Sequence, residues 1–481
     1  MLQATAFGAA AVASPVLAPR SAAAAGAPRI VVVGGGLAGL SAASMLTKAG
    51  YAARVFEAST RLGGRCWSYT QGEFADRQVA EHGGELIDQG HTAIRQLVQS
   101  LGLDLDNLLA AQPNGTEDFY RFLGRPYSYA QATDDLKAIW QTIHADVSAA
   151  SYPTLYNSYT ARGFELDHTS VYQYIDQVVP GGHQAPLGQL LDVAYNIEYG
   201  AETTIQSALN LLYLLAYSGQ GQLRIFGPSN EKYHVRGGND QIVSRLAATL
   251  AGQITTGAAL QAIARNSDGS YALTFGGARR VTADHVVLAL PFSLLRQVDY
   301  RRAGFNPVKV RAITELPMGT NSKLHLQFKS RPWYGLGNNG NTFADTGYQS
   351  TWEVTRAQPG PSGILVDYTG GTIGASFSPP NGSPGSRAAT FLRQIDPLLP
   401  GLSAHWNGRA FIDHWAGNPW ALGSYSYWKV GQYTGFSGAE KEASGNCHFA
   451  GEHTSQDFQG YLNGAVETGQ RAAGEILTAL K

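Results

Sequence analysis

The 481-residue sequence contains very little cysteine, with only Cys66 and Cys447. Two thiols exclude a disulfide framework and a thiolate metal cluster. A single bridge between them is an open alternative, but the favoured interpretation is two buried free thiols. His82, His234 and His453 lie outside any metal-ligand or catalytic-triad spacing, so we expect them to be structural, and we expect no metal site.

Charge and long apolar runs are also sparse. Charged residues make up 15% of the chain and the formal net charge is −1, so the charge balance does not indicate binding to nucleic acid or to an anionic membrane. Beyond the N-terminal leader, no stretch of about 18 apolar residues occurs, so we expect no membrane span and no C-terminal anchor. With 44% hydrophobic residues the chain is globular, and its length predicts two domains.

Glycine, by contrast, is abundant, and three glycines of the 57 form the most informative motif. The β-branched run 30–33 predicts a short buried strand, and Gly34, Gly36 and Gly39 follow it at the G-x-G-x-x-G spacing that opens a helix. Gly34 permits a tight turn, Gly36 leaves room for a diphosphate, and Gly39 lets the helix pack closely on the strand. The helix N-terminus then faces the diphosphate.

A second strand is predicted at 51–56, after Gly50 ends the helix, and Glu57 closes it. A carboxylate roughly 20 residues after the glycines accepts hydrogen bonds from a ribose diol and repels a 2′-phosphate. The segment therefore predicts dinucleotide binding, and up to this point both FAD and NAD remain open.

The residues after Glu57 resemble a known family. Arg61, Gly63, Gly64 and Arg65 form an R-x-G-G-R run, and a second glycine pair follows in the segment EHGG at 81–84. This resembles the flavin-containing amine oxidase family, in which the acid, the R-x-G-G-R run and the later glycine pair wrap an extended FAD. The resemblance extends over almost the whole chain from Arg29 onward.

The family resemblance implies an α/β fold with a Rossmann-type FAD-binding domain and an inserted α+β substrate-binding domain, the two-domain architecture shared with p-hydroxybenzoate hydroxylase. The segments 29–90, 232–305 and 440–481 would form the FAD-binding domain, and 91–231 with 306–439 the substrate-binding domain. The cofactor-binding residues that it implies are Gly34, Gly36, Leu37, Ala38, Gly39, Glu57, Ala58, Arg61, Gly63, Gly64, Arg65, Gly83, Gly84, Glu85, Leu86, Leu260, Trp415, Gly451, Glu452, Tyr461 and Leu462.

Hydrophobic periodicity predicts the remaining elements. The segment 112–230 has no strand pattern and predicts a helical insertion, with its best helices near 134–149, 169–178, 186–197 and 203–217; Thr203 is the expected cap of the last of these. A helix is also expected from about residue 91 to Gly102. Later strands are expected at 253–260, 271–275, 280–281, 285–290, 323–328, 363–368, 410–415 and 446–453, and later helices at 241–250 and 464–480.

Two long stretches match the family's substrate site. The segment 415–425 is similar to W-x-x-x-P-x-x-x-G-x-Y and implies that Tyr425 is one wall of an aromatic cage. The segments 451–455 and 460–465 are similar to the terminal G-E-x-T and G-Y-x-x-G-A motifs and imply that Tyr461 is the other wall. Lys323, in the pattern M-G-x-x-x-K, matches a lysine that the family places near flavin N5. Ser424 stands where some members carry a cysteine that bonds the flavin, so we expect non-covalent FAD.

The segment Glu85-Leu86-Ile87-Asp88 bears on the class of substrate. It follows the glycine pair, where an L-amino-acid oxidase carries the arginine that binds the substrate carboxylate. We expect its carboxylates near the mouth of the cavity, where they attract a cation, unless they face solvent or cap the helix that starts near Thr92. Arg224 is a candidate for a substitute arginine, so the amino-acid oxidase stays open.

We therefore expect an FAD-dependent amine oxidase. It would oxidise a primary or secondary amine to an imine by hydride transfer to flavin N5, water would hydrolyse the imine to an aldehyde, and O₂ would be reduced to H₂O₂. The alternatives are an L-amino-acid oxidase of the same fold, a carotenoid-type desaturase and a flavin-binding protein without turnover. A homodimer is compatible with the sequence.

Residues 1–28 contain an Ala-rich apolar run followed by small residues, with no charge before Arg20. They resemble the hydrophobic and cleavage parts of an export signal that lacks its basic start, as in the tail of a twin-arginine signal. This predicts a secreted or periplasmic enzyme. The alternative is a disordered extension on a cytoplasmic enzyme.

Overall fold

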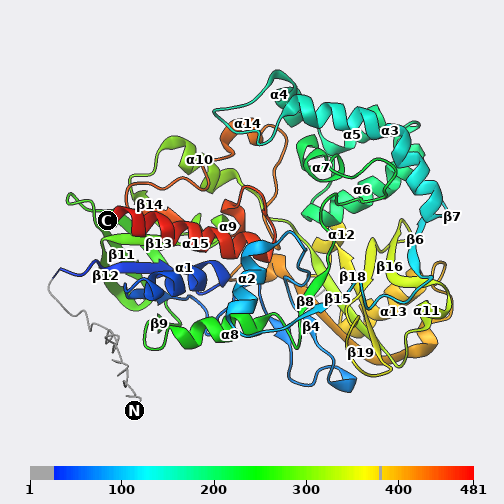
Figure 1. Ribbon diagram of the computed structural model, residues 1–481, viewed down its shortest axis with the longest axis horizontal. Coiled ribbons are helices and arrows are strands. Elements are labelled where there is room, and N and C mark those ends of the chain that lie inside the picture. The colour runs from blue at the N-terminus through cyan, green and yellow to red at the C-terminus, as the bar shows by residue number, and fades with distance from the viewer. Residues whose placement is uncertain (1–25, 379–381) are drawn as a thin grey trace, which may run out of the picture.

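The computed structural model describes residues 26–378 and 382–481, so all but three residues of the expected leader 1–28 lie outside the described residues. Figure 1 shows a parallel sheet flanked by helices in one half of the molecule, and a larger sheet with a helical layer above it in the other half. The two halves correspond to the two kinds of sheet described below.

The first sheet is parallel, with the order β20-β13-β1-β2-β9. Its central strand β1 is buried at all four positions, as expected for a parallel sheet that is covered on both faces. Helix α1 (Leu37–Lys48) packs against the C-terminal helix α15 (Leu462–Ala479). Its strands are β1 (Ile30–Val33), β2 (Ala53–Phe56), β9 (Ile254–Thr255), β13 (His285–Leu288) and β20 (Cys447–Phe449).

A second, four-stranded sheet contains the strands expected at 271–275 and 280–281 and has the order β12-β11-β10-β14. The expected strand 253–260 is wrong, because the chain leaves β9 at Thr255 and turns at Gly257, where φ is +66°. The chain enters this second sheet only at Leu260. The strands are β10 (Leu260–Arg265), β11 (Tyr271–Phe275), β12 (Arg279–Ala283) and β14 (Asp299–Arg302).

The largest sheet has seven strands in the order β19-β15-β18-β17-β16-β6-β7. Its edge corrects the prediction that 112–230 contains no strands, because β6 (Glu117–Phe122) and β7 (Arg125–Tyr127) form a hairpin around Leu123 and Gly124, both at positive φ. β6 pairs with β16, a strand too distant in sequence for local periodicity to reveal. The other strands are β15 (Ser322–Phe328), β16 (Asn338–Ala344), β17 (Ser350–Glu353), β18 (Gly363–Thr369) and β19 (Trp406–His414).

A layer of helices lies above this sheet (Figure 1). The helix expected at 203–217 begins only at Ala208, because Ser207 and not Thr203 caps it; the Thr203 hydroxyl instead donates to Asp192. The helices are α3 (Tyr129–Ala150), α4 (Ala161–Asp167), α5 (Val171–Val178), α6 (Pro186–Tyr199) and α7 (Ala208–Leu215).

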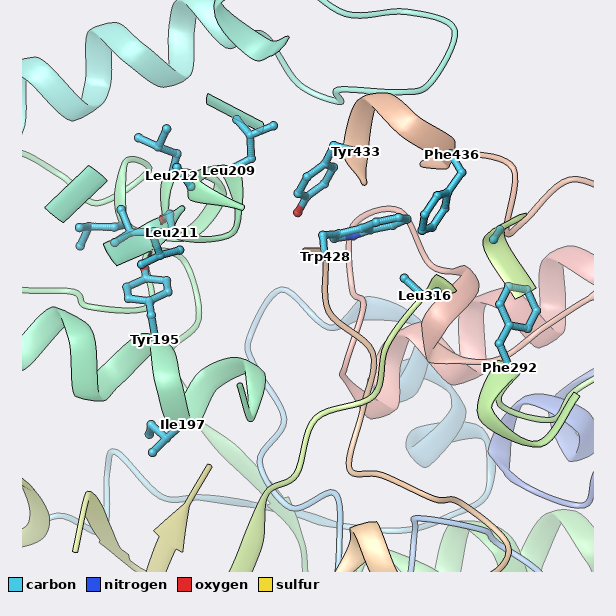
Figure 2. Close-up of a cluster of buried hydrophobic side chains, with 14 of the residues drawn as sticks. Tyr195, Ile197, Leu209, Leu211, Leu212, Phe292, Leu316, Trp428, Tyr433 and Phe436 are labelled. Atoms are coloured by element: carbon cyan, nitrogen blue, oxygen red, sulfur yellow. Dashed lines mark hydrogen bonds between the residues drawn. The ribbon is translucent and has the colours of Figure 1, made fainter. Parts of the chain in front are cut away.

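A buried aromatic cluster joins this layer to the late part of the chain. Figure 2 shows Trp428 close to Tyr433 and Phe436, with ring centroids 5.0 and 5.4 Å from the Trp428 ring. The backbone carbonyl of Trp428 accepts a hydrogen bond from the Asn210 amide at 2.8 Å. Helix α7 is thereby fixed to the segment that follows Tyr425.

Short elements complete the described chain: β3 (Ser68–Tyr69), β4 (Ala80–Glu81), α2 (Thr92–Ser100), β5 (Leu105–Asn107), β8 (Tyr233–Val235), α8 (Asp240–Thr249), α9 (Phe292–Leu295), α10 (Pro307–Glu315), α11 (Pro332–Gly335), α12 (Gly371–Ala375), α13 (Pro384–Ile395) and α14 (Tyr433–Phe436). Within residues 26–378 and 382–481, no helix combines the length and apolar character needed to span a membrane.

Candidate active site

One cavity of about 1230 Å³ joins the two halves of the molecule. Its wall includes the glycine motif after β1, the start of β10, the strands β15 and β18, and the ends of α6 and β20. Every cofactor-binding or catalytic residue expected from the sequence lines this cavity except Gly39. The structure therefore brings together residues from distant parts of the chain at a single site.

The three motif glycines differ in what surrounds them. A Cβ on Gly39 would lie 1.9 Å from the Gly34 carbonyl oxygen, and one on Gly34, which has φ of +106°, would lie 2.5 Å from the Ala289 oxygen. A Cβ on Gly36 would meet only the Gly63 oxygen, at 3.9 Å, on the cavity side. Gly39 and Gly34 are thus required by backbone packing, whereas Gly36 leaves an open cradle at the N-terminus of α1, as a diphosphate requires.

Glu57 is buried at the end of β2 and lines the cavity with Ala58. Its carboxylate accepts hydrogen bonds from the backbone N–H groups of Gly35, at 2.6 Å, and Ser59, at 2.8 Å. These two bonds fix the carboxylate beside the glycine cradle. Its bond to a ribose diol stays a prediction.

The two arginines of the R-x-G-G-R run fix the conformation of this segment. The Arg61 guanidinium donates to the carbonyls of Leu62 and Gly64 and lies 4.3 Å from the Trp67 ring centroid. Arg65 donates to the Ser424 carbonyl and pairs with Glu452 at 2.7 Å. The first arginine thus shapes the glycine turn, and the second ties it to the later motifs.

Glu452 is the centre of a buried polar cluster. Besides Arg65, its carboxylate accepts hydrogen bonds from the Ser426 hydroxyl at 2.8 Å and the Gly460 N–H at 2.9 Å. Burial alone would raise the pKa of Glu452, but the Arg65 charge and these hydrogen bonds hold that pKa below its ordinary value. The carboxylate is ionised and joins the R-x-G-G-R run to the terminal motif, and its contact with the cofactor stays a prediction.

The second glycine pair makes the close backbone approach that its motif indicates. A Cβ on Gly83 would lie 2.1 Å from the Arg65 carbonyl oxygen, and one on Gly84 would lie 2.6 Å from a Leu462 methyl group. The Trp415 indole N–H donates to the His82 carbonyl at 2.7 Å. The second glycine pair, Trp415 and the start of α15 therefore form one continuous part of the cavity wall.

Lys323 is buried on β15, with its side chain at the cavity wall. Its ammonium group donates to the carbonyls of Glu81, at 3.1 Å, and Gly83, at 2.9 Å, and pairs with Glu85 at 2.8 Å. The other Glu85 oxygen accepts a hydrogen bond from the Trp352 indole at 2.9 Å. The charge is thus held rigidly beside the second glycine pair.

This ion pair corrects the expectation that Glu85 and Asp88 offer free negative charge at the cavity mouth. Glu85 is compensated by Lys323. Asp88 accepts hydrogen bonds from the Ser229 hydroxyl and from the N–H groups of Asn230 and Glu231, and pairs with His91 at 3.1 Å. Both carboxylates hold protein segments together.

The two expected cage tyrosines both line the cavity and have unexpected partners. The Tyr425 hydroxyl lies 2.8 Å from the Tyr368 hydroxyl and donates to the Ile197 carbonyl at 3.0 Å. The Tyr461 hydroxyl donates to Glu198 at 3.1 Å. Sequence reasoning missed Tyr368 and Glu198. Tyr368 lies in β18, within the expected strand 363–368, whereas Glu198 lies in the last turn of α6, one residue beyond the expected helix 186–197, so neither position carried a functional signal of its own.

Ser424 and Cys66 are the residues of this wall most relevant to a covalent bond with the cofactor. The Ser424 hydroxyl donates to Asn321 at 2.6 Å. Cys66 and Cys447 are both buried free thiols, as predicted. Burial raises the pKa of the Cys66 thiol well above its usual value, so this thiol is not a nucleophile at neutral pH.

The expected structural histidines have separate environments. His82 pairs with Asp413 at 2.6 Å and stacks between Trp67 and Tyr69, and His234 pairs with Glu81 at 2.8 Å. Burial lowers the pKa of His453 to about 3. In the described part of the chain, no group of three or more His, Cys, Asp or Glu side chains is arranged to hold a metal ion.

The family of this chain follows from its similarity to known proteins. Residues 37–477 match the model of the flavin containing amine oxidoreductase family. The chain belongs to this family. It is accordingly an FAD-dependent oxidoreductase that acts on amines. The open cradle at Gly36 and the ionised carboxylate of Glu452 suit the family's cofactor.

Individual relatives are distant but span nearly the whole chain. The chain is 26% identical to a putative flavin-containing monoamine oxidase of Mycobacterium tuberculosis, over 94% of this chain and 97% of that protein. It is 25% identical to nicotine dehydrogenase of Pseudomonas putida, over 93% and 88% respectively.

Solved structures confirm the predicted fold. Cyclohexylamine oxidase from Brevibacterium oxydans superposes with a TM-score of 0.83 at 21% identity, covering 95% of this chain and all of that one. Putrescine oxidase bound to putrescine superposes with a TM-score of 0.81 at 21% identity, covering 94% and 99%. The two-domain flavoenzyme architecture is thus shared.

Proposed function

We propose that this enzyme oxidises a primary or secondary amine with an apolar body, with O₂ as the electron acceptor and H₂O₂ as the reduced product. The observation that supports this most directly is the convergence of Tyr425, Tyr461 and Lys323 on one cavity with the glycine motifs. Such a constellation is expected of amine oxidation and is not needed by a flavin-binding protein without turnover or by a carotenoid-type desaturase.

FAD, when bound, supplies the hydride acceptor at its N5 atom. The protein must present the amine as a neutral molecule, because the nitrogen lone pair has to be free when the C–H bond breaks. Tyr425 and Tyr461 are proposed to flank the amine with aromatic faces, and this desolvated setting lowers the pKa of the substrate amine. Water later hydrolyses the imine to an aldehyde.

Lys323 is proposed to act in the reaction with O₂. Its ammonium group is fixed by two backbone carbonyls and Glu85. A fixed positive charge in a desolvated wall stabilises the negative charge that develops when O₂ accepts an electron. The residues expected to bind FAD keep the roles proposed from the sequence, and the FAD is proposed to be non-covalent because Ser424 cannot form a thioether.

The cavity wall supports an apolar substrate body. Apart from the glycine motifs, the cavity wall includes Leu108, Tyr129, Phe226, Phe343 and Tyr368. An aromatic or alicyclic amine would bury apolar surface against these side chains, at about 25 cal/mol per Å².

A second candidate, oxidation of an L-amino acid, is favoured by two arginines in the same wall. Arg224 is exposed on the cavity side, whereas Arg356 donates to the carbonyl of Asn339 and to Asn341. Either arginine could hold a carboxylate. Peroxide release from the holoenzyme, measured with 2-phenylethylamine and with L-phenylalanine at equal concentrations, separates the two functions: we expect a larger kcat/KM for the amine, and a larger value for the amino acid would assign the second function.

We also propose that residues 1–28 direct export to the periplasm or the medium, and that the enzyme forms a homodimer. Appending these residues to a reporter protein tests the first proposal, and light scattering of the holoenzyme tests the second. A reporter retained in the cytoplasm, or a monomeric mass, would contradict them.

A further inference from the structure

Glu198 lies on the last turn of α6, inside the cavity and beside both cage tyrosines. Tyr461 donates to one of its oxygens at 3.1 Å. Among the described residues no lysine, arginine or histidine forms an ion pair with it. The carboxylate is thus half-buried at the cavity wall and has no cation of the described chain to compensate its charge.

The backbone holds this residue in place. Gly200 ends α6 with φ of +64°, and a Cβ there would lie 2.0 Å from the Asn321 amide oxygen. The Asn321 amide in turn donates to the Ile197 carbonyl at 2.6 Å. The end of α6 is thus fastened to the segment that leads into β15, so Glu198 keeps a constant position relative to Lys323 and the cage.

Its surroundings explain why the carboxylate accepts a proton readily. The titratable groups that interact with it are Tyr461, Tyr195, Tyr199, Tyr368, Tyr425, Glu231 and Asp88. Burial and the neighbouring charges of Glu231 and Asp88 raise the pKa of Glu198 to about 8, against a smaller opposing effect of the Tyr461 hydrogen bond. The C-terminal end of a helix dipole also favours a positive charge or a proton at this place.

We propose that Glu198 is a catalytic residue that takes the proton from the substrate ammonium ion inside the cavity. One N–H bond of the ammonium breaks and one O–H bond forms on the carboxylate, while the electron pair of the broken bond stays on nitrogen as the lone pair that oxidation requires. No oxidant takes part in this step. The proposal rests on the amine oxidation proposed above and adds the group that prepares the substrate.

The first test is the pH dependence of kcat/KM for a primary alkylamine. Such an ammonium ion, like a lysine side chain, has a pKa of about 10. In the native enzyme the carboxylate form of Glu198 binds the abundant cation, so kcat/KM should rise with pH and level off above about pH 8. In Glu198→Gln only free neutral amine is productive, so kcat/KM should keep rising to the pKa of the amine, with a loss on the order of 100-fold at pH 8.

Glu117→Gln is the matched control, because Glu117 is another carboxylate of the cavity wall and is exposed. It should leave the shape of the profile unchanged. Tyr461→Phe keeps the ring but removes the hydrogen bond that lowers the pKa of Glu198. The pH above which kcat/KM levels off should therefore rise. This variant also tests the proposal if Glu198→Gln does not retain FAD. Identical profiles for native enzyme and Glu198→Gln, or an unmoved profile for Tyr461→Phe, would overturn the proposal.

The second test needs no turnover. 1-Adamantylamine has no hydrogen on the carbon that bears nitrogen, so it cannot be oxidised to an imine. Calorimetry at pH 9 in buffers of different ionisation enthalpy should show no net proton release when it binds the native holoenzyme, and release of about one proton with Glu198→Gln. Zero release from both proteins would contradict the proton transfer. Failure of the amine oxidation itself would instead appear as an oxidised flavin that no amine reduces.

Discussion

Lys323 and Glu85 form a buried ion pair, so a substitution at either position disturbs two charges. Lys323→Met should slow the reaction of reduced flavin with O₂ far more than flavin reduction by the amine. It should also destabilise the fold by about 3 to 5 kcal/mol, because it leaves Glu85 buried without a partner. Stopped-flow measurement of both half-reactions tests the first expectation, and thermal unfolding tests the second.

The double variant Lys323→Met with Glu85→Gln separates these effects. It should regain much of the stability while the O₂ reaction stays slow. A rapid O₂ reaction in the double variant would show that Lys323 has only a structural role.

Glu57 gives a second prediction at the scale of single residues. Its carboxylate is fixed by Gly35 and Ser59 beside the cradle. Glu57→Gln should weaken FAD binding by about 1 to 3 kcal/mol, the range for a hydrogen bond to a charged group. Titration of the apoprotein with FAD measures this. An unchanged dissociation constant would mean that the ribose does not contact Glu57.

Residues within short, locally defined motifs could be predicted from the sequence, and residues joined across the chain could not. The glycine motif, Lys323, Tyr425 and Tyr461 each stand in a stretch whose spacing can be read directly, and the structure brings them to one cavity. Glu198 meets Tyr461 across a separation of 263 residues. No spacing rule links two such positions, so the partner of Tyr461 emerged only from the fold.

At the scale of elements, α1 depends on Gly39 for its position on β1. Gly39→Ala would place a Cβ 1.9 Å from the Gly34 carbonyl oxygen, which requires the helix to move. We expect a loss of stability of about 1 to 3 kcal/mol or more, together with weaker FAD retention. Thermal unfolding and the FAD content of the purified protein measure both effects.

Gly474→Ala is the control for this substitution. Gly474 lies within α15, and a Cβ there would meet no atom within 4 Å. Alanine should stabilise a helix interior by about 0.5 to 1 kcal/mol relative to glycine. Equal effects of the two substitutions would contradict the close-packing role of Gly39.

The elements also show why periodicity failed in two places. The hairpin of β6 and β7 joins a sheet whose other members lie far along the chain, and its polar, charged residues mask the alternation on which strand prediction depends. The prediction of a strand at 253–260 did not allow for Gly257, whose positive φ turns the chain from one sheet to another. In both cases long-range pairing or a single glycine outweighed the local pattern.

For the whole molecule, the mode of cofactor attachment can be tested without kinetics. Acid precipitation of the holoenzyme should release all FAD into the supernatant, since the residue before Tyr425 is Ser424 and the Cys66 thiol has a raised pKa. Absorbance of the supernatant measures this. Yellow chromophore that remains with the precipitated protein would contradict non-covalent binding.

The cavity as a whole also argues for a preference between substrates that differ only in a carboxylate. Glu198 and Glu231 both line the cavity. In their ionised forms these two carboxylates repel an anion. An amine therefore suits these two carboxylates better than an amino acid does.

The central claim is that an amine bound in this cavity is oxidised at its C–N bond. The most direct test is anaerobic mixing of the holoenzyme with 2-phenylethylamine, following the flavin absorbance and the aldehyde formed. We predict complete bleaching of the flavin with one aldehyde per flavin, and recovery of the oxidised spectrum when O₂ is admitted. A flavin that stays oxidised with this amine and with a panel of other amines, but is bleached by an L-amino acid, would contradict the account.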